Sequence, residues 1–463
     1  MDQYDCIAPL DARYAEDAAP LGPYLSENAF TRYKLKVELA LVKALAKLEI
    51  IPENLRERAI KEVRTACEKV TTAEVSAEEK WTKHDIVALV NCICKYVSDE
   101  VKPYIHMFAT SYDIVENANA ARYRDAVRGE LLPQLQKFLE VLIDLTLREK
   151  DTVQIGRTHG QHAVPITVGF AFSEYVSRIG NSILEIKRHT ENLRGKFSGA
   201  VGAYNTTALF LPDPLEFERL VLKEMQLEPA EASTQINMPE PIARLLLEII
   251  TMASILANLA DDMRHLQRTE IAEVGEPFEK GQVGSSAMPP KQNPINFENV
   301  KSMWKILVGR AMTIHLDLIS EHQRDLTNSA SGRTYGEIIA YAFLMVQRMT
   351  RVMAKLTVNK ENLQRNLMLQ GDLIGAEPFQ NILRELGHPK AHEVIRVLSI
   401  QARQEKKSLW DLAESDPQLA PYLERMTAKQ KAVIQRPWEK YTGIAAQKAE
   451  HIALKWQEWL QLN

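Results

Sequence analysis

Residues 131–145 read LLPQLQKFLEVLIDL, and the spacing of the apolar residues in this stretch predicts the fold. The apolar positions step by four and three residues: Leu131, Leu135, Phe138, Leu142 and Leu145. Such steps place side chains on one face of an α-helix. The stretch therefore predicts a long helix that packs against others through one apolar face.

The same spacing recurs in two further runs: Phe172, Val176, Ile179, Ile183 and Ile186, and Val300, Trp304, Leu307, Ala311 and Ile314. Three such faces in one chain indicate long helices packed nearly parallel or antiparallel. We therefore expect an all-α protein with a long central helical bundle. The faces fit a bundle within one monomer, and some of them also fit contacts with other subunits.

Turn-forming residues divide the chain into three expected domains. Residues 1–111 hold shorter helical pieces, residues 112–364 contain the long apolar runs, and residues 365–463 contain short amphipathic pieces separated by prolines. Glycine is scarce, at 19 of 463 residues, and alternating strand patterns are hard to find. Both observations favour helices in all three domains.

Composition argues against several classes of protein. The chain has 57 basic and 61 acidic residues and a net charge of −4, so nothing indicates a nucleic-acid or membrane-binding surface. The most apolar stretch, residues 245–260, is interrupted by polar residues. We expect it to be too short and too polar to span a bilayer, and to lie inside the bundle.

The four cysteines, at positions 6, 67, 92 and 94, match neither a zinc site nor a redox motif. The first residues, MDQYDCIAPLD, carry acids and lack the apolar run of a secretory signal. We therefore expect reduced thiols in a cytoplasmic protein.

Residues 281–299, GQVGSSAMPPKQNPINFEN, depart from the helical pattern and lie between two helical runs. A connector between helices usually needs only a few residues, so a segment of this length more often covers a site. Ser285 and Ser286 stand near Lys291 and Asn293, groups that suit holding an anion or activating a serine. A solvent-exposed loop rich in turn formers is the alternative.

Three polar clusters stand at expected helix starts, where free N–H donors favour carboxylates and phosphates. They are residues 82–85 (TKHD), 106–113 (HMFATSYD) and 156–161 (GRTHGQ). Ordinary N-capping accounts for Asp85, Thr110 and Ser111 equally well. Each cluster also contains a histidine, the usual proton donor or acceptor near neutral pH: His84, His106 and His159.

A metal site is not predicted. His159 and His162 are three residues apart, as ligands on a helix can be, but no carboxylate or cysteine nearby completes a set. His388 and His392 also have ligand-like spacing, which a surface helix explains as well.

Two arginines and a hydroxyl within ten residues suit a phosphate dianion: Arg324, Ser329 and Arg333. A charged helix end with local ion pairs is the alternative. Arg13 and Tyr14 add a further cation and an aromatic hydroxyl, a weak signal by itself.

Together these motifs resemble the fumarase/aspartase-type lyases, whose hallmark is a GSSxMPxKxN loop, present here as GSSAMPPKQN at residues 284–293. Within that superfamily the chain is similar to the adenylosuccinate lyase family. The supporting motifs are DARY (11–14), KHD (83–85), His106 with Thr110 and Ser111, RTHGQ (157–161), TQI (234–236), and RDLTNS (324–329) with Arg333.

The resemblance implies an all-α chain of three domains, with central helices that form a bundle shared between the subunits of a homotetramer. Each active site would take residues from three subunits. It implies cleavage of adenylosuccinate to AMP and fumarate, and of the succinylated aminoimidazole carboxamide ribotide (SAICAR) to AICAR, in purine biosynthesis. It implies no cofactor or metal.

β-Elimination needs a base for a weakly acidic C–H, an acid for the leaving nitrogen, and donors for the extra negative charge. By resemblance Ser285 is the base and His159 is the acid. Glu298 would pair with a histidine, for which we expect His159, and orient it. His84 would help to position or charge-balance the acid and the phosphate side of the substrate.

The remaining expected site residues bind substrate. Those that would hold the succinyl carboxylates are Lys291, Asn293, Thr110, Ser111 and Gln235. Those that would hold the AMP part are Arg13, Tyr14, Arg324, Ser329 and Arg333. Seven further motif residues complete the expected site: Lys83, Asp85, His106, Thr158, Gln161, Ser286 and Met288.

The chain departs from the family pattern without losing a proposed chemical group at four positions: Ala12, His162, Phe170 and Pro290. One alternative is another lyase of the superfamily with a different succinyl substrate, against which the phosphate-suited residues argue. The other is a non-catalytic helical scaffold, against which the intact acid, base and loop residues argue.

Overall fold

The computed structural model describes residues 5–278 and 281–462. The expected all-α fold is confirmed, because 67% of the chain is helical and 5% lies in strands. Two compact units are formed: unit 1 comprises residues 1–135, 181–256 and 302–347, and unit 2 comprises residues 136–180, 257–301 and 348–463. The domain boundaries expected after residues 111 and 364 stay a prediction.

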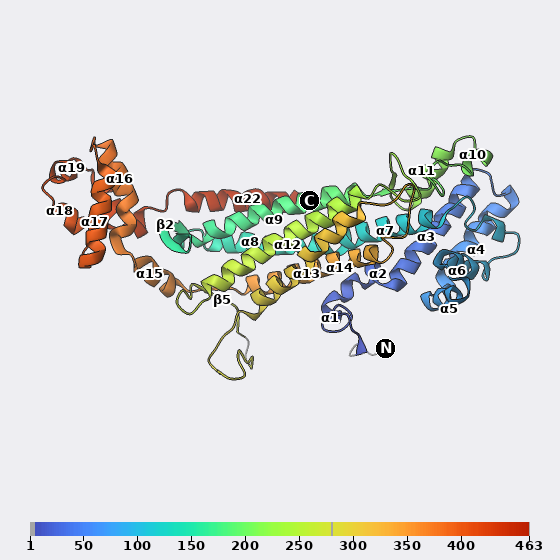
Figure 1. Cartoon of the computed structure of the whole chain (residues 1–463), viewed down its shortest axis with the longest axis horizontal. Coiled ribbons are helices and arrows are strands. Elements are labelled where there is room, and N and C mark those ends of the chain that lie inside the picture. Colours follow the sequence, from blue (N-terminus) through green and yellow to red (C-terminus); the bar gives the residue numbers. More distant parts are fainter. Residues whose placement is uncertain (1–4, 279–280, 463) are drawn as a thin grey trace. The chain divides into compact units, whose positions relative to one another are not determined.

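Unit 1 is built around α3 (Glu27–Lys47), which packs against α4 (Arg56–Lys69) and α7 (Ser111–Ala126). The side chain of Ser26 caps the start of α3 by accepting the N–H of Ala29 at 3.1 Å. The remaining helices of the unit, shown in Figure 1, are α1 (Ala15–Ala18), α2 (Gly22–Leu25), α5 (Thr72–Thr82), α6 (Asp85–Cys94), α10 (Thr207–Phe210) and α11 (Pro214–Glu224).

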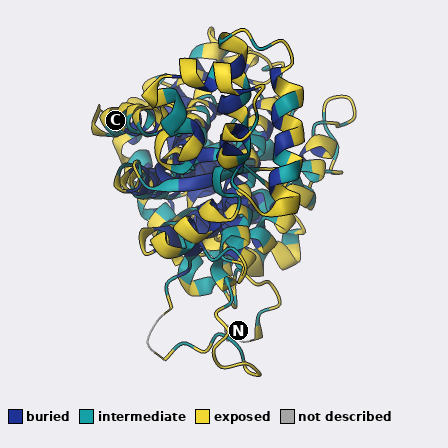
Figure 2. Cartoon of the chain, turned by 90° about the vertical axis from the view of Figure 1, so that its left-hand side faces the viewer, coloured by how far each residue is buried: buried dark blue, intermediate teal, exposed yellow. Residues whose placement is uncertain are grey.

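Five long helices have residues in both units: α8 (Leu132–Arg148), α9 (Val168–Glu191), α12 (Glu240–Leu266), α13 (Ile295–Asp317) and α14 (Tyr335–Ala354). The three apolar runs predicted from the sequence fall on α8, α9 and α13, and most of their residues are buried. Buried residues, dark blue in Figure 2, lie on the inside of the packed helices. Leu131 alone precedes α8, in the short π-helical turn Val127–Leu131.

Hydrogen bonds within each unit show which of these helices are neighbours. In unit 2, Arg178 on α9 donates to Asn258 on α12 at 2.9 Å. In unit 1, the indole N–H of Trp304 on α13 donates to Ser254 on α12 at 2.8 Å. The helices therefore pack side by side through polar contacts as well as apolar faces.

Helix α12 corrects one expectation. It has 27 residues, and its most apolar window has a mean hydropathy of 1.7, so by length and composition it could cross a membrane. Within the described residues, 61% of that window is buried inside the protein, as expected for a core helix. The expectation that the stretch lies inside the bundle agrees with this burial, whereas the expectation that it is too short and too polar was wrong.

The last part of unit 2 is a set of short helices with its own apolar core, in which Phe379, Leu383 and Leu409 are fully buried. These helices are α16 (Ala376–Glu385), α17 (Ala391–Glu405), α18 (Leu409–Glu414), α19 (Ala420–Arg425) and α20 (Ala428–Gln435). The same part of the chain also contains α15 (Lys360–Met368), α21 (Pro437–Lys440) and the longer α22 (Ala445–Leu462).

Three short two-stranded pairs occur among the described residues. Strands β1 (Val153–Thr158) and β2 (Gln161–Thr167) form an antiparallel hairpin. The other pairs are β3 (Arg194–Gly195) with β4 (Glu228–Pro229), and β5 (Val274–Gly275) with β6 (Thr357–Val358).

Candidate active site

Unit 1 contains a cavity of ≈ 460 Å³ that collects residues from three distant stretches of sequence. Seven of the predicted site residues line it: Lys83, His84, Asp85, Ser111, Arg324, Ser329 and Arg333. The helix start at residues 82–85 and the arginine stretch at 324–333 are thus brought together by the fold.

The starts of α6 and α7 meet in this cavity. Two of the three polar clusters thus lie at helix starts, as the sequence predicted. His84 is the N-cap residue of α6, and its Nε2 lies 3.4 Å from the Ser111 hydroxyl at the start of α7. Lys34 bonds the Asp85 carboxylate at 3.0 Å. Burial opposes ionisation of Asp85, but the charge and hydrogen bond of Lys34 hold its pKa below the ordinary value.

Arg324 is held by an aromatic neighbour. Its Nη2 donates to the Tyr112 hydroxyl at 2.8 Å, and its guanidinium carbon lies 4.7 Å from the centre of the Tyr112 ring. Glu116 lines the same cavity, and burial raises the pKa of its carboxyl. Arg333 is more exposed, with its nearest acidic partner, Glu27, at 3.8 Å.

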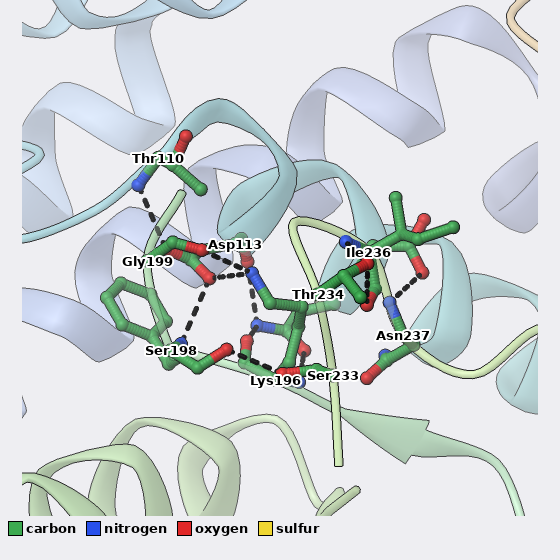
Figure 3. Close-up of polar contacts among 12 residues, drawn as sticks. Thr110, Asp113, Lys196, Ser198, Gly199, Ser233, Thr234, Ile236 and Asn237 are labelled. Carbon is green, nitrogen blue, oxygen red and sulfur yellow. Dashed lines mark hydrogen bonds and ion pairs between the residues drawn. The ribbon is translucent and has the colours of Figure 1, made fainter. Parts of the chain in front are cut away.

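A buried polar network lies beneath the start of α7 (Figure 3). Thr110 and Asp113 form a capping box, in which each side chain accepts the other residue's N–H. The Asp113 carboxylate also pairs with the Lys196 ammonium at 2.5 Å, and neither side chain is exposed.

Sequence reasoning missed Lys196. The stretch GKFSGAVGAY at residues 195–204 could have signalled it, because it has three glycines and a lysine in a chain with little glycine. Gly199 and Gly202 adopt φ values of +79° and +77°, a conformation that L side chains rarely adopt.

Five predicted residues of unit 1 are absent from the lining of this cavity: Arg13, Tyr14, His106, Thr110 and Gln235. The Tyr14 ring packs edge-on against Tyr341, with centroids 6.4 Å apart. His106 Nδ1 lies 2.7 Å from an oxygen of Glu38, which is fully buried. Burial favours the neutral ring, yet the Glu38 hydrogen bond and charge raise the pKa of His106 above its ordinary value.

In unit 2, His159 stands at the tip of the β1–β2 hairpin and not at a helix start, which corrects the prediction for GRTHGQ. Thr158 pairs with Gln161, so His159 and Gly160 form a two-residue turn, with φ values of +53° and +72°. Positive φ at both positions is typical of the type I′ turns that close hairpins. Thr158, His159 and Gln161 are exposed.

A buried carboxylate anchors this hairpin. Glu273 is fully buried and bonds both Nη atoms of Arg157, at 2.6 and 3.0 Å. It also accepts hydrogen bonds from Gln154 at 2.8 Å and Asn366 at 2.9 Å. The strand that leads to His159 is thereby tied to the core of unit 2.

His162 lies opposite Arg157 in the hairpin. Burial and the Arg157 charge lower the pKa of His162 below its ordinary value. The ring is therefore mostly neutral at physiological pH. Among the described residues, no group of three or more His, Cys, Asp or Glu side chains could hold a metal ion.

The loop before α13 places its serine among backbone donors. The Ser285 hydroxyl accepts the N–H groups of Ala287 at 3.3 Å and Met288 at 3.1 Å. Asn293 donates to the Gly284 carbonyl at 2.8 Å. A Cβ on Gly284 would lie 1.9 Å from the Lys291 carbonyl oxygen, so this close crossing of the loop requires glycine.

Lys291, Asn293 and Glu298 line a second cavity, of ≈ 910 Å³, within unit 2. Arg264, His265 and Arg268 of α12 and the residues after it also line this cavity. Glu298 belongs to the first turn of α13, since the helix begins at Ile295, inside the segment expected to be a loop. Ser286 and Met288 are exposed. The predicted site residues thus form two sets, one in each unit.

Two family models match the chain: one described as "Lyase" over residues 13–309, and one described as "Adenylosuccinate lyase C-terminal" over residues 320–430. An adenylosuccinate lyase of Pyrococcus abyssi is 36% identical over 431 residues, 90% of this chain and 92% of the relative. The chain belongs to the adenylosuccinate lyase family. A family member from Archaeoglobus fulgidus is 33% identical and covers 97% of this chain and 98% of its own length.

Solved structures show the same fold at lower identity. A fumarate lyase from Mesorhizobium sp. BNC1 has a TM-score of 0.82 at 21% identity, covering 95% of this chain and 97% of that one. A 3-carboxy-cis,cis-muconate lactonizing enzyme from Pseudomonas putida has a TM-score of 0.83 at 22% identity, with coverage of 95% and 97%. At these identities the likeness supports the lyase fold alone.

The Glu273 anchor leads to a stability prediction. Glu273→Ala removes the buried partner of the Arg157 guanidinium and of the Gln154 and Asn366 side-chain amides. It should therefore lower the free energy of unfolding by about 3–5 kcal/mol. Chemical denaturation at one fixed protein concentration measures the change.

Glu393 provides the matched control, because it makes a similar two-bond pair with Arg396, at 2.7 and 2.9 Å, between exposed side chains of α17 in the same unit. Glu393→Ala should leave the denaturation midpoint unchanged. Equal effects of the two substitutions would contradict the anchoring role of Glu273.

Proposed function

We propose that the chain catalyses β-elimination of fumarate from adenylosuccinate, giving AMP, and from SAICAR, giving AICAR, as steps in purine biosynthesis. The observation that carries the proposal is the cavity of unit 1, where phosphate-suited arginines lie with His84 and Ser111. Membership of the adenylosuccinate lyase family supports it for a chain that covers most of its relatives' length.

In this proposal Arg324, Ser329 and Arg333 bind the AMP part of the substrate. A guanidinium can donate two parallel hydrogen bonds to a phosphate, and Tyr112 holds that of Arg324 in a set orientation. Arg13 and Tyr14 complete the nucleotide-binding set.

Ser285 is the proposed base. A serine hydroxyl is normally far too weak an acid to lose its proton, and the alkoxide needs donors that stabilise its charge. Two backbone N–H groups already point at the Ser285 oxygen. Lys291 of the same loop adds a positive charge.

The reaction then follows from the proposed roles. Ser285 removes a proton from the carbon next to a succinyl carboxylate, and the electron pair spreads into that carboxylate. Lys291, Asn293, Thr110, Ser111 and Gln235 stabilise the added charge. The C–N bond breaks, the electron pair forms the double bond of fumarate, and the leaving nitrogen takes a proton from His159.

Of the two hairpin histidines, His159 is the proposed acid. His162 is partly buried beside Arg157, and its lowered pKa leaves it little protonated near neutral pH. His159 extends from the exposed tip of the turn, where it can reach a substrate. Glu298 is the proposed partner that orients it, and His84 balances charge near the acid.

Homotetramer formation is part of the proposal. Helix α13 exposes an apolar stripe of Val308, Met312 and Leu316, with exposed fractions of 42%, 65% and 62%. Their spacing of four residues places them on one helix face. Exposed apolar stripes of this kind mark interfaces between chains. If each active site of the tetramer takes residues from three subunits, residues of unit 1 and unit 2 from different chains can form one site. We also propose a cytoplasmic location.

An absorbance assay with the purified protein tests the reaction. Adenylosuccinate and SAICAR should be consumed with release of fumarate, while argininosuccinate and malate should not react. Turnover of a different succinyl compound, without turnover of either purine substrate, would show that the substrate assignment is wrong.

Two substitutions separate the proposed chemistry from binding. Ser285→Ala should lower kcat by about 10²- to 10⁴-fold with little change in AMP affinity, because only the base is lost. Arg324→Ala should raise KM about tenfold or more with a small change in kcat, because a phosphate contact is lost. Steady-state kinetics and AMP inhibition measure both, and a near-normal rate for Ser285→Ala would place the base elsewhere.

The subunit proposal is tested at the α13 stripe. The double substitution Met312→Glu and Leu316→Glu places two charges on the apolar face, so light scattering should report a mass below that of a tetramer. Turnover should fall as the tetramer is lost. Ile7→Glu, at a side chain that is 99% exposed, is the control and should change neither. If the double variant still has the mass of a tetramer, this stripe is not a subunit interface.

A further inference from the structure

Lys196 is a fully buried charged residue for which the proposed reaction has no role. Its ammonium bonds the Asp113 carboxylate at 2.5 Å and the Gly199 carbonyl at 3.2 Å. Both partners of the ion pair have no exposed side-chain surface. Burying two charges is costly unless each is paired and hydrogen-bonded, so a pair at this place calls for an explanation.

The Asp113 carboxylate joins two segments. One oxygen accepts the N–H of Thr110 at 2.9 Å, which caps the start of α7. The other oxygen accepts the Lys196 ammonium and the N–H of Ser198 at 3.2 Å. The start of α7, with Thr110 and Ser111, is therefore tied to residues 196–198.

The same network reaches the segment that carries Gln235 (Figure 3). The hydroxyls of Ser198 and Ser233 are 2.7 Å apart. A Cβ on Gly202 would lie 2.1 Å from the Ser233 carbonyl oxygen, so the two turns are in close contact. On the other side of Gln235, the Asn237 side chain donates to the Arg194 carbonyl at 3.0 Å, so both ends of the segment are held.

The Lys196–Asp113 pair also affects the charge at the start of α7. The N–H groups of Ser111 and Tyr112 are the first two of the helix and have no carbonyl within it to bond. They and the helix dipole attract an anion. Asp113, in the same turn, carries a negative charge that opposes a second anion unless a cation neutralises it.

We propose that Lys196 is a positioning residue for the dicarboxylate part of the substrate. It neutralises Asp113, the carboxylate that joins the start of α7 to residues 196–198, so that the first turn of α7 stays attractive to a carboxylate. The inference rests on the proposed function, in which Thr110 and Ser111 are among the residues that hold the succinyl carboxylates.

The test compares product inhibition by fumarate and by AMP in the assembled enzyme. Lys196→Met removes the cation at similar volume and leaves Asp113 charged, so the inhibition constant for fumarate should rise about tenfold. The constant for AMP should change less than about threefold, because other residues hold the phosphate.

The opposite substitution makes the test specific. Asp113→Asn removes the opposing charge while an amide oxygen can still cap Thr110, so fumarate inhibition should not weaken even if stability falls. The double variant Asp113→Asn with Lys196→Met should return the fumarate constant to within about threefold of wild type. If the role of Lys196 were purely structural, both single variants would instead weaken inhibition by fumarate and by AMP to the same extent.

Arg124→Met is the matched control, because Arg124 is another buried cation of unit 1 and bonds the carbonyls of Met225 and Gln226. It should lower stability without changing the ratio of the two inhibition constants. If Lys196→Met does not fold, Asp113→Asn and the double variant decide the question.

Two results would overturn the inference: an unchanged fumarate constant in Lys196→Met, or weaker fumarate inhibition in Asp113→Asn and in the double variant. Failure of the proposed function has a different signature. In that case the wild-type enzyme itself would not cleave adenylosuccinate or be inhibited by fumarate, and the inference would fall with it.

Discussion

Buried carboxylates hold the non-helical segments of this helical protein. A helix satisfies its own backbone hydrogen bonds, but a loop or a short hairpin depends on partners supplied by the rest of the fold. Glu273 anchors the β1–β2 hairpin through the side chains of Gln154 and Arg157. Asp113 accepts the backbone N–H groups of Thr110, at the start of α7, and of Ser198. Glu276 does the same at the start of α13, where it accepts the N–H groups of Asn296 and Phe297. Three of the segments that carry the proposed chemistry thus lie beside a buried acid.

The two sets of site residues are supported differently. In unit 1, His84, Ser111 and Arg324 stand on helix starts or against an aromatic ring, and they line one cavity. In unit 2, His159 stands exposed on a turn and Ser285 half-buried on a long loop. This difference suits the proposed reaction, in which a firmly held nucleotide meets a base and an acid on segments that close over it.

Individual residues show how far sequence reasoning reached. The apolar runs predicted α8, α9 and α13, because the spacing of apolar side chains is a local property of each helix. The hairpin was missed, since its strands are short and the polar GRTHGQ stretch has the composition of a helix start. Lys196 was missed as well, because nothing local to it reveals that its charge will be buried against Asp113, 83 residues earlier in the chain.

The sequence by itself determined the helical class, the family and the chemical groups available, because periodicity and motif spacing are written along the chain. Only the tertiary structure decided which groups meet. His84 and Ser111 are 27 residues apart in sequence yet 3.4 Å apart in space, and Arg324 bonds a tyrosine 212 residues away. Such contacts depend on how whole helices pack, and packing is set by the sum of many side chains that no single motif contains.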